Sequence, residues 1–251
     1  MKNLLLCLCC LLATASSAQC INNQSGACNS KFRIGVKAGV NMTDYKNGSL
    51  DIFFPALVED DGYFGSESWF GYHLGIEVQY MFTKHIGISS GLTYSEYNVR
   101  ESFFLDFGHD PNSYMPLWFF PKAVANPSYL HLPINFLYKF DFSTKTKFYP
   151  SVGVYLGYGL GGKTELKTPR VQTEFYEIES LTLSEDFFGE TKFQRFDAGL
   201  GAGLTLDINH FSIGVTGKMG LINAVHKDDR VRDYNDKISL VEFGITLGYF
   251  F

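Results

Sequence analysis

The chain lacks the long apolar runs of a helical membrane protein. Beyond its N-terminal region, no window of eighteen or more apolar residues occurs among the 251 residues, which excludes membrane-spanning helices. The formal net charge is only -5, and this mild acidity argues against a nucleic-acid partner. No glycine-rich phosphate loop and no pair of catalytic carboxylates stands out, because the glycines recur at the period of a strand.

The N-terminal region reads as a secretion signal. Lys2 precedes a short apolar run from Leu4 to Leu12, and small residues follow from Ser16 to Ala18. A cation, a short apolar core and small residues in this order are typical of a cleaved signal peptide. We therefore expect a signal peptide over residues 1–18 and a periplasmic N-terminal tail over residues 19–30.

Cysteine is scarce, and three of the five cysteines lie inside the expected signal peptide. Cleavage would leave Cys20 and Cys28, and an even count in an exported chain favours a disulfide between them. Two free thiols or a metal pair are the alternatives, although no histidine lies nearby to complete a metal site. Gln19 before Cys20 disfavours lipid attachment at that cysteine, where a small residue is needed.

Glycine and aromatic residues are abundant, with 25 Gly, 24 Phe and 15 Tyr. In the last segment, from Val241 to Phe251, every odd position is apolar, whereas Glu242, Gly244, Thr246 and Gly248 are polar or small. Because strand side chains alternate between two faces, one face suits hydrocarbon and the other suits a polar interior. The terminal Tyr249 and Phe251 resemble the C-terminal signal that the outer-membrane assembly machinery recognises.

Seven earlier segments repeat this alternation. Short turns and long loops alternate between the segments, as in outer-membrane barrels with short periplasmic turns. The pattern predicts an all-β fold: an eight-stranded antiparallel transmembrane β-barrel over residues 31–251, an up-and-down meander with four long extracellular loops and both termini in the periplasm. A soluble lipocalin-like barrel is the alternative, but the many glycines on the polar face argue against it. The segments are 32–42, 70–82, 86–94, 130–142, 148–160, 196–208 and 211–221, and the long loops run from about 43–69, 98–127, 161–192 and 223–237.

The polar face carries charges of both signs in nearly equal number. An eight-stranded barrel is only wide enough for its own side chains, and buried charges need partners, so we expect a salt-bridge network in the lumen. The alternative is a narrow conduit for small solutes or ions, lined by the same groups. The charged residues expected in this network are Arg33, Lys37, Glu77, Lys139, Asp141, Lys147, Arg195, Asp197, Asp207, Lys218 and Glu242.

A lipid-modifying enzyme is the second alternative, because such an enzyme needs a nucleophile beside a positioned base. His210 and Ser212 form a His-x-Ser pair, but they lie beside a short turn rather than at the outer face. His73 shares a face with Glu77, yet a lumen histidine is more often a hydrogen-bonded structural residue. We therefore expect no enzyme activity, no catalytic residues, no bound metal and no cofactor.

The long loops carry aromatic clusters, among which Trp118, Phe119 and Phe120 are consecutive. Exposed aromatic clusters often mark interaction sites, so these three residues are candidates for a partner-contact loop. Packing over the barrel mouth or within an interfacial aromatic girdle is an equally good interpretation.

Several segments resemble the PorT family of small outer-membrane β-barrels. They include Ile34–Asn41, Gly91–Ser95, Tyr129–Pro133, Phe148–Gly153 and Leu247–Phe251. The resemblance covers the strands and little of the loops, and its motifs are architectural. It implies an integral outer-membrane protein that acts as an accessory or adaptor in protein secretion or surface assembly. The partners implied are outer-membrane lipids, the assembly machinery and other envelope or secretion proteins.

Overall fold

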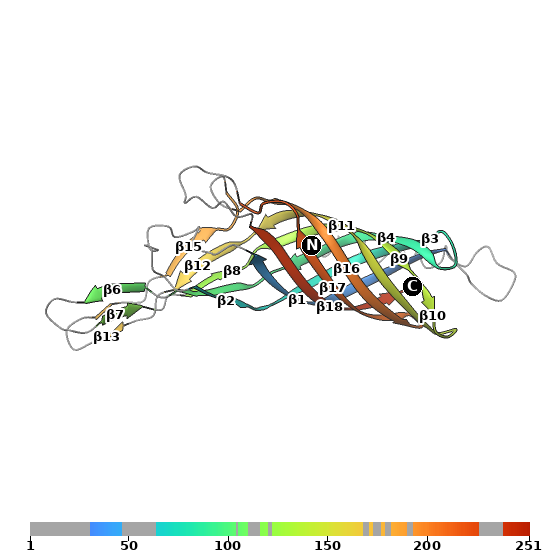
Figure 1. Cartoon of the computed structure of the whole chain (residues 1–251), viewed down its shortest axis with the longest axis horizontal. Helices are drawn as coiled ribbons and strands as arrows, with labels where there is room; N and C mark the ends of the chain where they lie inside the picture. Colours follow the sequence, from blue (N-terminus) through green and yellow to red (C-terminus); the bar gives the residue numbers. More distant parts are fainter. Residues whose placement is uncertain are drawn as a thin grey trace, which may run out of the picture.

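Within the residues that the structure describes, the regular elements are eighteen β-strands, and nine of them form one elongated barrel (Figure 1). The computed structural model describes residues 31–46, 64–103, 105–109, 116–119, 122–167, 171–172, 177–178, 182–189, 193–225 and 238–251. Within these ranges, no helix is long and apolar enough to cross a membrane. The expected signal peptide and tail, with Cys20 and Cys28, lie outside the described residues, and so does Phe120.

The barrel is an antiparallel ring. Each strand pairs with the next along the chain, β18 pairs with β1, and β11 pairs with both β9 and β16, so the sheet has no open edge. β10 is a two-residue continuation of β9 beyond Lys139. The strands of the ring are β1 (Phe32–Lys46), β3 (Phe70–Met81), β4 (Ile86–Glu96), β9 (Ser128–Tyr138) with β10 (Phe140–Asp141), β11 (Thr146–Gly161), β16 (Phe196–Ile208), β17 (Phe211–Gly220) and β18 (Ser239–Phe250).

Alternation places apolar side chains outside and polar ones inside. On β18, Phe243 is 52% exposed while its neighbour Glu242 is 3% exposed. The same contrast repeats around the ring, where exposed Leu200 and Leu204 of β16 flank residues that face the lumen. An apolar exterior around a polar interior is the arrangement of a membrane barrel and the reverse of a soluble one.

Short turns join the strands at one end, which we name the turn end. In two of them a hydroxyl holds the turn: Thr83 Oγ1 accepts hydrogen bonds from the amides of His85 and Ile86, and Ser143 Oγ does the same for Lys145 and Thr146. The third turn contains Asn209, whose positive φ of 59° is a conformation that Asn tolerates better than most residues.

At the opposite end, part of the chain expected as long loops forms a second sheet. Its five strands run in the order β15–β12–β8–β5–β2 and prolong the barrel (Figure 1). The sequence interpretation missed them because each has only four or five residues. Their alternation is nevertheless clear, since Val99, Ala123, Ala125 and Leu166 are buried. The strands are β2 (Phe64–Ser68), β5 (Val99–Phe103), β8 (Lys122–Ala125), β12 (Lys163–Lys167) and β15 (Thr182–Asp186).

Four further strands complete the described elements. β6 (Leu105–His109) pairs with β7 (Pro116–Phe119), and β13 (Val171–Gln172) pairs with β14 (Glu177–Ile178). The backbone of Trp118 and Phe119 therefore belongs to a two-stranded hairpin beyond the barrel. The expected partner-contact loop is thus partly strand.

Candidate functional site

The lumen is the candidate site, and its charged side chains lie in layers from one end to the other. Nearest the turn end, Arg33 of β1 reaches across to Asp207 of β16, with 2.8 Å between Nη1 and Oδ2. The same guanidinium donates to Tyr149 Oη at 3.0 Å and to Gln79 Oε1 at 3.3 Å, and it lies 4.4 Å from the centroid of the Phe250 ring. Arg33 is therefore held on several sides.

Phe250 closes the lumen at the turn end. Its side chain is 1% exposed and packs against Gly35, where a Cβ atom would lie only 2.6 Å from the ring. Phe250 is an even-numbered residue of β18 and hence faces inward, whereas its neighbours Tyr249 and Phe251 face outward. The ring fits because Gly35 leaves space opposite it.

The next layer contains the ion pair between Lys37 and Glu77, from neighbouring strands β1 and β3. Gln79 Nε2 donates to the other oxygen of Glu77 at 2.7 Å, which links this layer to Arg33. Together the two layers fill the half of the lumen nearest the turn end with mutually compensating charges.

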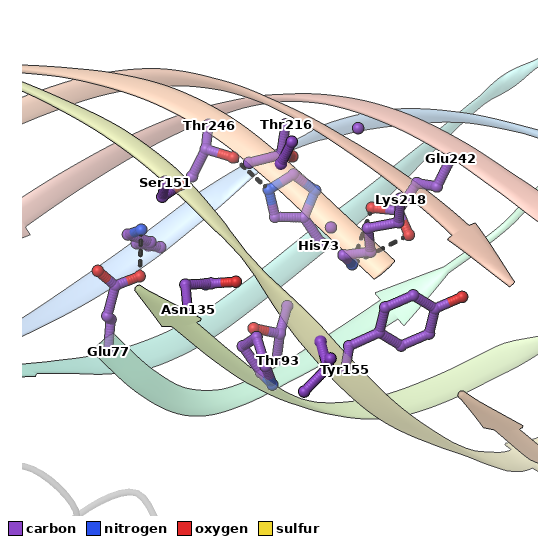
Figure 2. A pocket seen from close by; sticks show the side chains of 16 residues that line it. His73, Glu77, Thr93, Asn135, Ser151, Tyr155, Thr216, Lys218, Glu242 and Thr246 are labelled. Atoms are coloured by element: carbon purple, nitrogen blue, oxygen red, sulfur yellow. Dashed lines mark hydrogen bonds and ion pairs between the residues drawn. The ribbon is translucent and has the colours of Figure 1, made fainter. Parts of the chain in front are cut away.

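A polar chamber of about 90 Å³ follows, with Glu77 on one side of it, Glu242 on the other and His73 between them (Figure 2). His73 Nε2 lies 2.8 Å from Thr246 Oγ1, and its Nδ1 has no protein partner within the described part of the chain. Since a water molecule needs about 10–15 Å³ of such volume, the chamber has room for a few waters. Its other polar lining comes from Thr93, Asn135, Ser151, Tyr155 and Thr216.

Beyond the chamber, Lys218 and Glu242 lie directly opposite each other on β17 and β18. Lys218 Nζ is 3.1 Å from both carboxylate oxygens of Glu242, and the carboxylate also accepts a hydrogen bond from the hydroxyl of Tyr97. Burial raises the pKa of Tyr97 well above its usual value, so this hydroxyl stays protonated and donates. His131, fully buried, lies 3.4 Å from the same hydroxyl.

Asp197 differs from the other acids because its partner is uncharged. Its Oδ2 accepts a 2.8 Å hydrogen bond from Tyr155, whose ring lies 5.8 Å from the Lys218 ammonium. The sequence interpretation expected pairing by charge alone, and it did not anticipate tyrosines from neighbouring strands as partners.

An aromatic cap covers the lumen at the end opposite the turn end, beside the five-stranded sheet. We use this name for Tyr45, Tyr97, Tyr129, Phe187, Phe188 and Phe193, which are all buried. Their rings are in mutual contact, with the centroids of Phe187 and Phe193 4.5 Å apart and those of Tyr45 and Phe193 4.8 Å apart. None of the three phenylalanines belongs to a barrel strand, so strand periodicity gave no signal for them.

Arg195 does not belong in the lumen, contrary to the sequence interpretation. It precedes β16 by one residue, is exposed, and donates through Nη1 to the carbonyl oxygens of Gly159 and Leu160 at 2.9 and 3.2 Å. Its guanidinium also lies 5.1 Å from the centroid of the Phe188 ring. Arg195 therefore supports the outer edge of the cap.

Two further predicted charges lie at the rim of the turn end. Lys139 and Asp141 are 3.4 Å apart, and the Asp141 side chain is 43% exposed. Lys147 lies in register between Asp141 and Asp207 on the neighbouring strands. This outer group is in contact with solvent and is distinct from the buried pairs further inside.

The histidines considered for catalysis make structural contacts. His210 Nδ1 donates to the carbonyl oxygen of Phe250 at 2.9 Å, and its ring stacks on Tyr249. Ser212 is buried on the lumen side, and no hydrogen bond joins it to His210 in the described contacts. His210 and Ser212 are therefore not joined as a base and a nucleophile in the described contacts.

These features define an integral β-barrel protein of the outer membrane. The family model for the outer membrane protein beta-barrel domain matches residues 17–225, so the chain belongs to this family. The match is to this broad family, and membership of the PorT family stays a prediction. No curated protein matches the chain.

The solved structures similar to this chain include an outer membrane protein, an attachment invasion locus protein and a surface protein. OprG of Pseudomonas aeruginosa is 15% identical over 87% of this chain and 95% of that one, with a TM-score of 0.40. Ail of Yersinia pestis, in complex with the heparin analogue sucrose octasulfate, is 12% identical over 88% and 99%, with a TM-score of 0.36. Neisserial surface protein A is 10% identical over 88% and 97%, also with a TM-score of 0.36.

Proposed function

We propose that the protein is a closed, non-enzymatic barrel that acts as an accessory or adaptor in protein secretion or surface assembly at the outer membrane. The observation that supports this most strongly is the occupied lumen, with Phe250 and Arg33 at one end and the aromatic cap at the other. A barrel filled in this way offers solutes no open path. Its surface beyond the membrane is then the part available to partners.

In this proposal the short turns and both termini face the periplasm, and the five-stranded sheet faces outward. Residues 1–18 are removed as a signal peptide, and a disulfide between Cys20 and Cys28 restrains the periplasmic tail. Tyr249 and Phe251, exposed beside Phe211, form the C-terminal assembly signal. The orientation follows from the general rule that periplasmic turns are short.

The partner contact is proposed to lie at the end opposite the turn end, around Trp118, Phe119 and Phe120. Cross-linking in intact outer membranes, followed by purification in mild detergent, should recover the same envelope or secretion components repeatedly. Alanine at these three positions should abolish that recovery. Alanine at Phe82 and Phe142, exposed aromatic residues of the turn end, provides the matched control. Recovery of the barrel alone, or equal loss in both variants, would contradict the adaptor function.

A narrow ion conduit is the second candidate, and the polar chamber around His73 is the observation that favours it. A conduit requires the chamber to connect with both ends, past the ion pairs and past the cap. Conductance across a planar bilayer separates the two candidates, since only the conduit produces current steps.

A further inference from the structure

The outer face of the five-stranded sheet carries a pair of lysines in direct register. Lys122 of β8 lies opposite Lys167 of β12, and their row continues with Ser102 of β5 and Thr182 of β15. No acid lies in this row. Because like charges directly opposite each other on neighbouring strands are destabilising, an anion bound between them would relieve their repulsion.

The two lysines differ in their other contacts. Lys167 Nζ lies 2.9 Å from Glu165 Oε2, a partially exposed pair on the same strand. Lys122 is exposed and has no ion-pair or hydrogen-bond partner within the part of the chain that the structure describes. Arg100 and Lys163 add positive charge on the same face of the central strands. The register brings Asp186 of β15 opposite Lys163. Glu165 offsets one of the two charges of the row, so Lys122 and Lys167 together carry one excess positive charge.

The position of Trp69 locates this row relative to the membrane. Trp69 is 45% exposed above the apolar wall of β3, and the Arg100 guanidinium lies 3.6 Å from its ring centroid. Exposed tryptophan in a membrane barrel is typical of the interface between hydrocarbon and headgroups. Backbone hydrogen bonds from Trp69 to Asn98 and from Asn126 to Lys163 place Lys163 at the same level.

Lys167 is four residues further along β12 than Lys163, which corresponds to about 13 Å along the strand and about 9 Å in height for a strand tilted by about 45°. The polar headgroup region on each side of a bilayer is roughly 5–8 Å thick. The backbone of the basic row thus lies just beyond the headgroups, from where a lysine side chain can reach back to them, on a face that continues the lipid-facing wall of β9 and β11.

We propose that Lys122 and Lys167 together bind a phosphate group of an anionic lipid in the outer leaflet. Their register brings both ammonium groups within reach of one phosphate, and the apolar wall below accepts the acyl chains of the same lipid. The site rests on the proposal that the five-stranded sheet lies on the outer side of the membrane. It does not depend on the adaptor function. It would hold the barrel at a fixed height among phosphorylated lipids.

The test measures binding of a fluorescent phosphorylated glycolipid to the full chain in nanodiscs of phosphatidylcholine, beside the dephosphorylated form of the same glycolipid. The variant is Lys122→Gln with Lys167→Gln. Its matched control is Lys84→Gln with Lys145→Gln, which removes two exposed charges from the turn end. A lysine near an anionic surface changes affinity by about fivefold, so the first variant should bind about thirtyfold more weakly and the control within about twofold of the unmodified protein.

Three results would overturn the proposal. The first is equal affinity for the phosphorylated and dephosphorylated glycolipids, and the second is the same loss of affinity in both double variants. The third is displacement of the lipid by inorganic phosphate at an equal concentration, which would indicate a site for free phosphate rather than for a lipid headgroup. A difference in gel mobility between heated and unheated samples verifies that each variant is folded.

Discussion

Replacing Glu242 with Gln should destabilise the barrel strongly, because it leaves the Lys218 ammonium without a counter-charge. The Glu242 side chain is 2% exposed and that of Lys218 is 16% exposed, so water can replace the lost carboxylate only in part. Breaking a buried ion pair by removing one partner costs about 3–5 kcal/mol. Gln keeps one oxygen for the hydroxyl of Tyr97, so we expect about 3 kcal/mol.

A double variant that removes both charges of this pair should be nearly neutral. Combining Lys218→Met with Glu242→Gln removes both charges together, and replacing a complete buried pair is often neutral or stabilising. The double variant should lie within about 1 kcal/mol of the unmodified protein, with a coupling energy of about 2 kcal/mol or more between the two positions.

The assay is reversible urea unfolding of the purified protein in lipid vesicles, followed by tryptophan fluorescence and by gel mobility. Lys84→Gln, in an exposed turn, serves as the control and should leave the midpoint unchanged. A single Glu242→Gln variant as stable as the unmodified protein would refute the reasoning. So would a double variant less stable than the single one, because the pair would then not be electrostatically coupled.

Two further predictions concern the ends of the lumen. Gly159→Ala places a methyl group against the Phe188 ring and should lower the free energy of unfolding by about 1–3 kcal/mol, whereas Gly161→Ala, with open space around it, should change it little. Phe250→Ala should cost about 3–5 kcal/mol by leaving a cavity beneath Arg33, while Phe251→Ala, 37% exposed, should cost far less. Urea midpoints of refolded protein measure both, and equal effects within either pair would contradict the closed ends.

The barrel itself could be predicted because its signal is repeated. Alternation in β18, such as exposed Ile245 between inward Gly244 and Thr246, recurs in every strand of the ring and fixes which face meets lipid. The short strands around Val99 and Ala123 could not be predicted, because four or five residues alternate too briefly to stand out from loop sequence.

The pairing within the lumen could be predicted only in part. Alternation identifies Arg33 and Asp207 as inward residues, but their contact joins the first and sixth strands of the ring and depends on closure of the barrel. Lys218 and Glu242 meet because of the register of β17 with β18, which no single strand encodes. Arg195 shows the opposite error. Its odd residue number matches the inward residues of β16, but Arg195 precedes that strand and lies outside the barrel wall.

The aromatic residues that close the lumen carry little sequence signal. Phe250 is one of several aromatic residues at the C-terminal end. Only its even position in β18, which places it on the inward face, distinguishes it from Tyr249 and Phe251. Phe187 and Phe193 lie between strands, where no periodicity applies. Their burial depends on the chain after β15 lying against the barrel mouth, as the hydrogen bond from the Phe187 amide to the Gly162 carbonyl indicates.

The most direct test of a closed barrel is single-channel recording in planar bilayers with the full chain, verified as folded by its gel mobility. A large-pore porin reconstituted in the same way serves as the positive control. A closed barrel should give no current steps above those of the bare bilayer at any protein concentration. Reproducible unitary steps whose frequency rises with the amount of protein would contradict it, and they would make the chamber around His73 part of a conducting path.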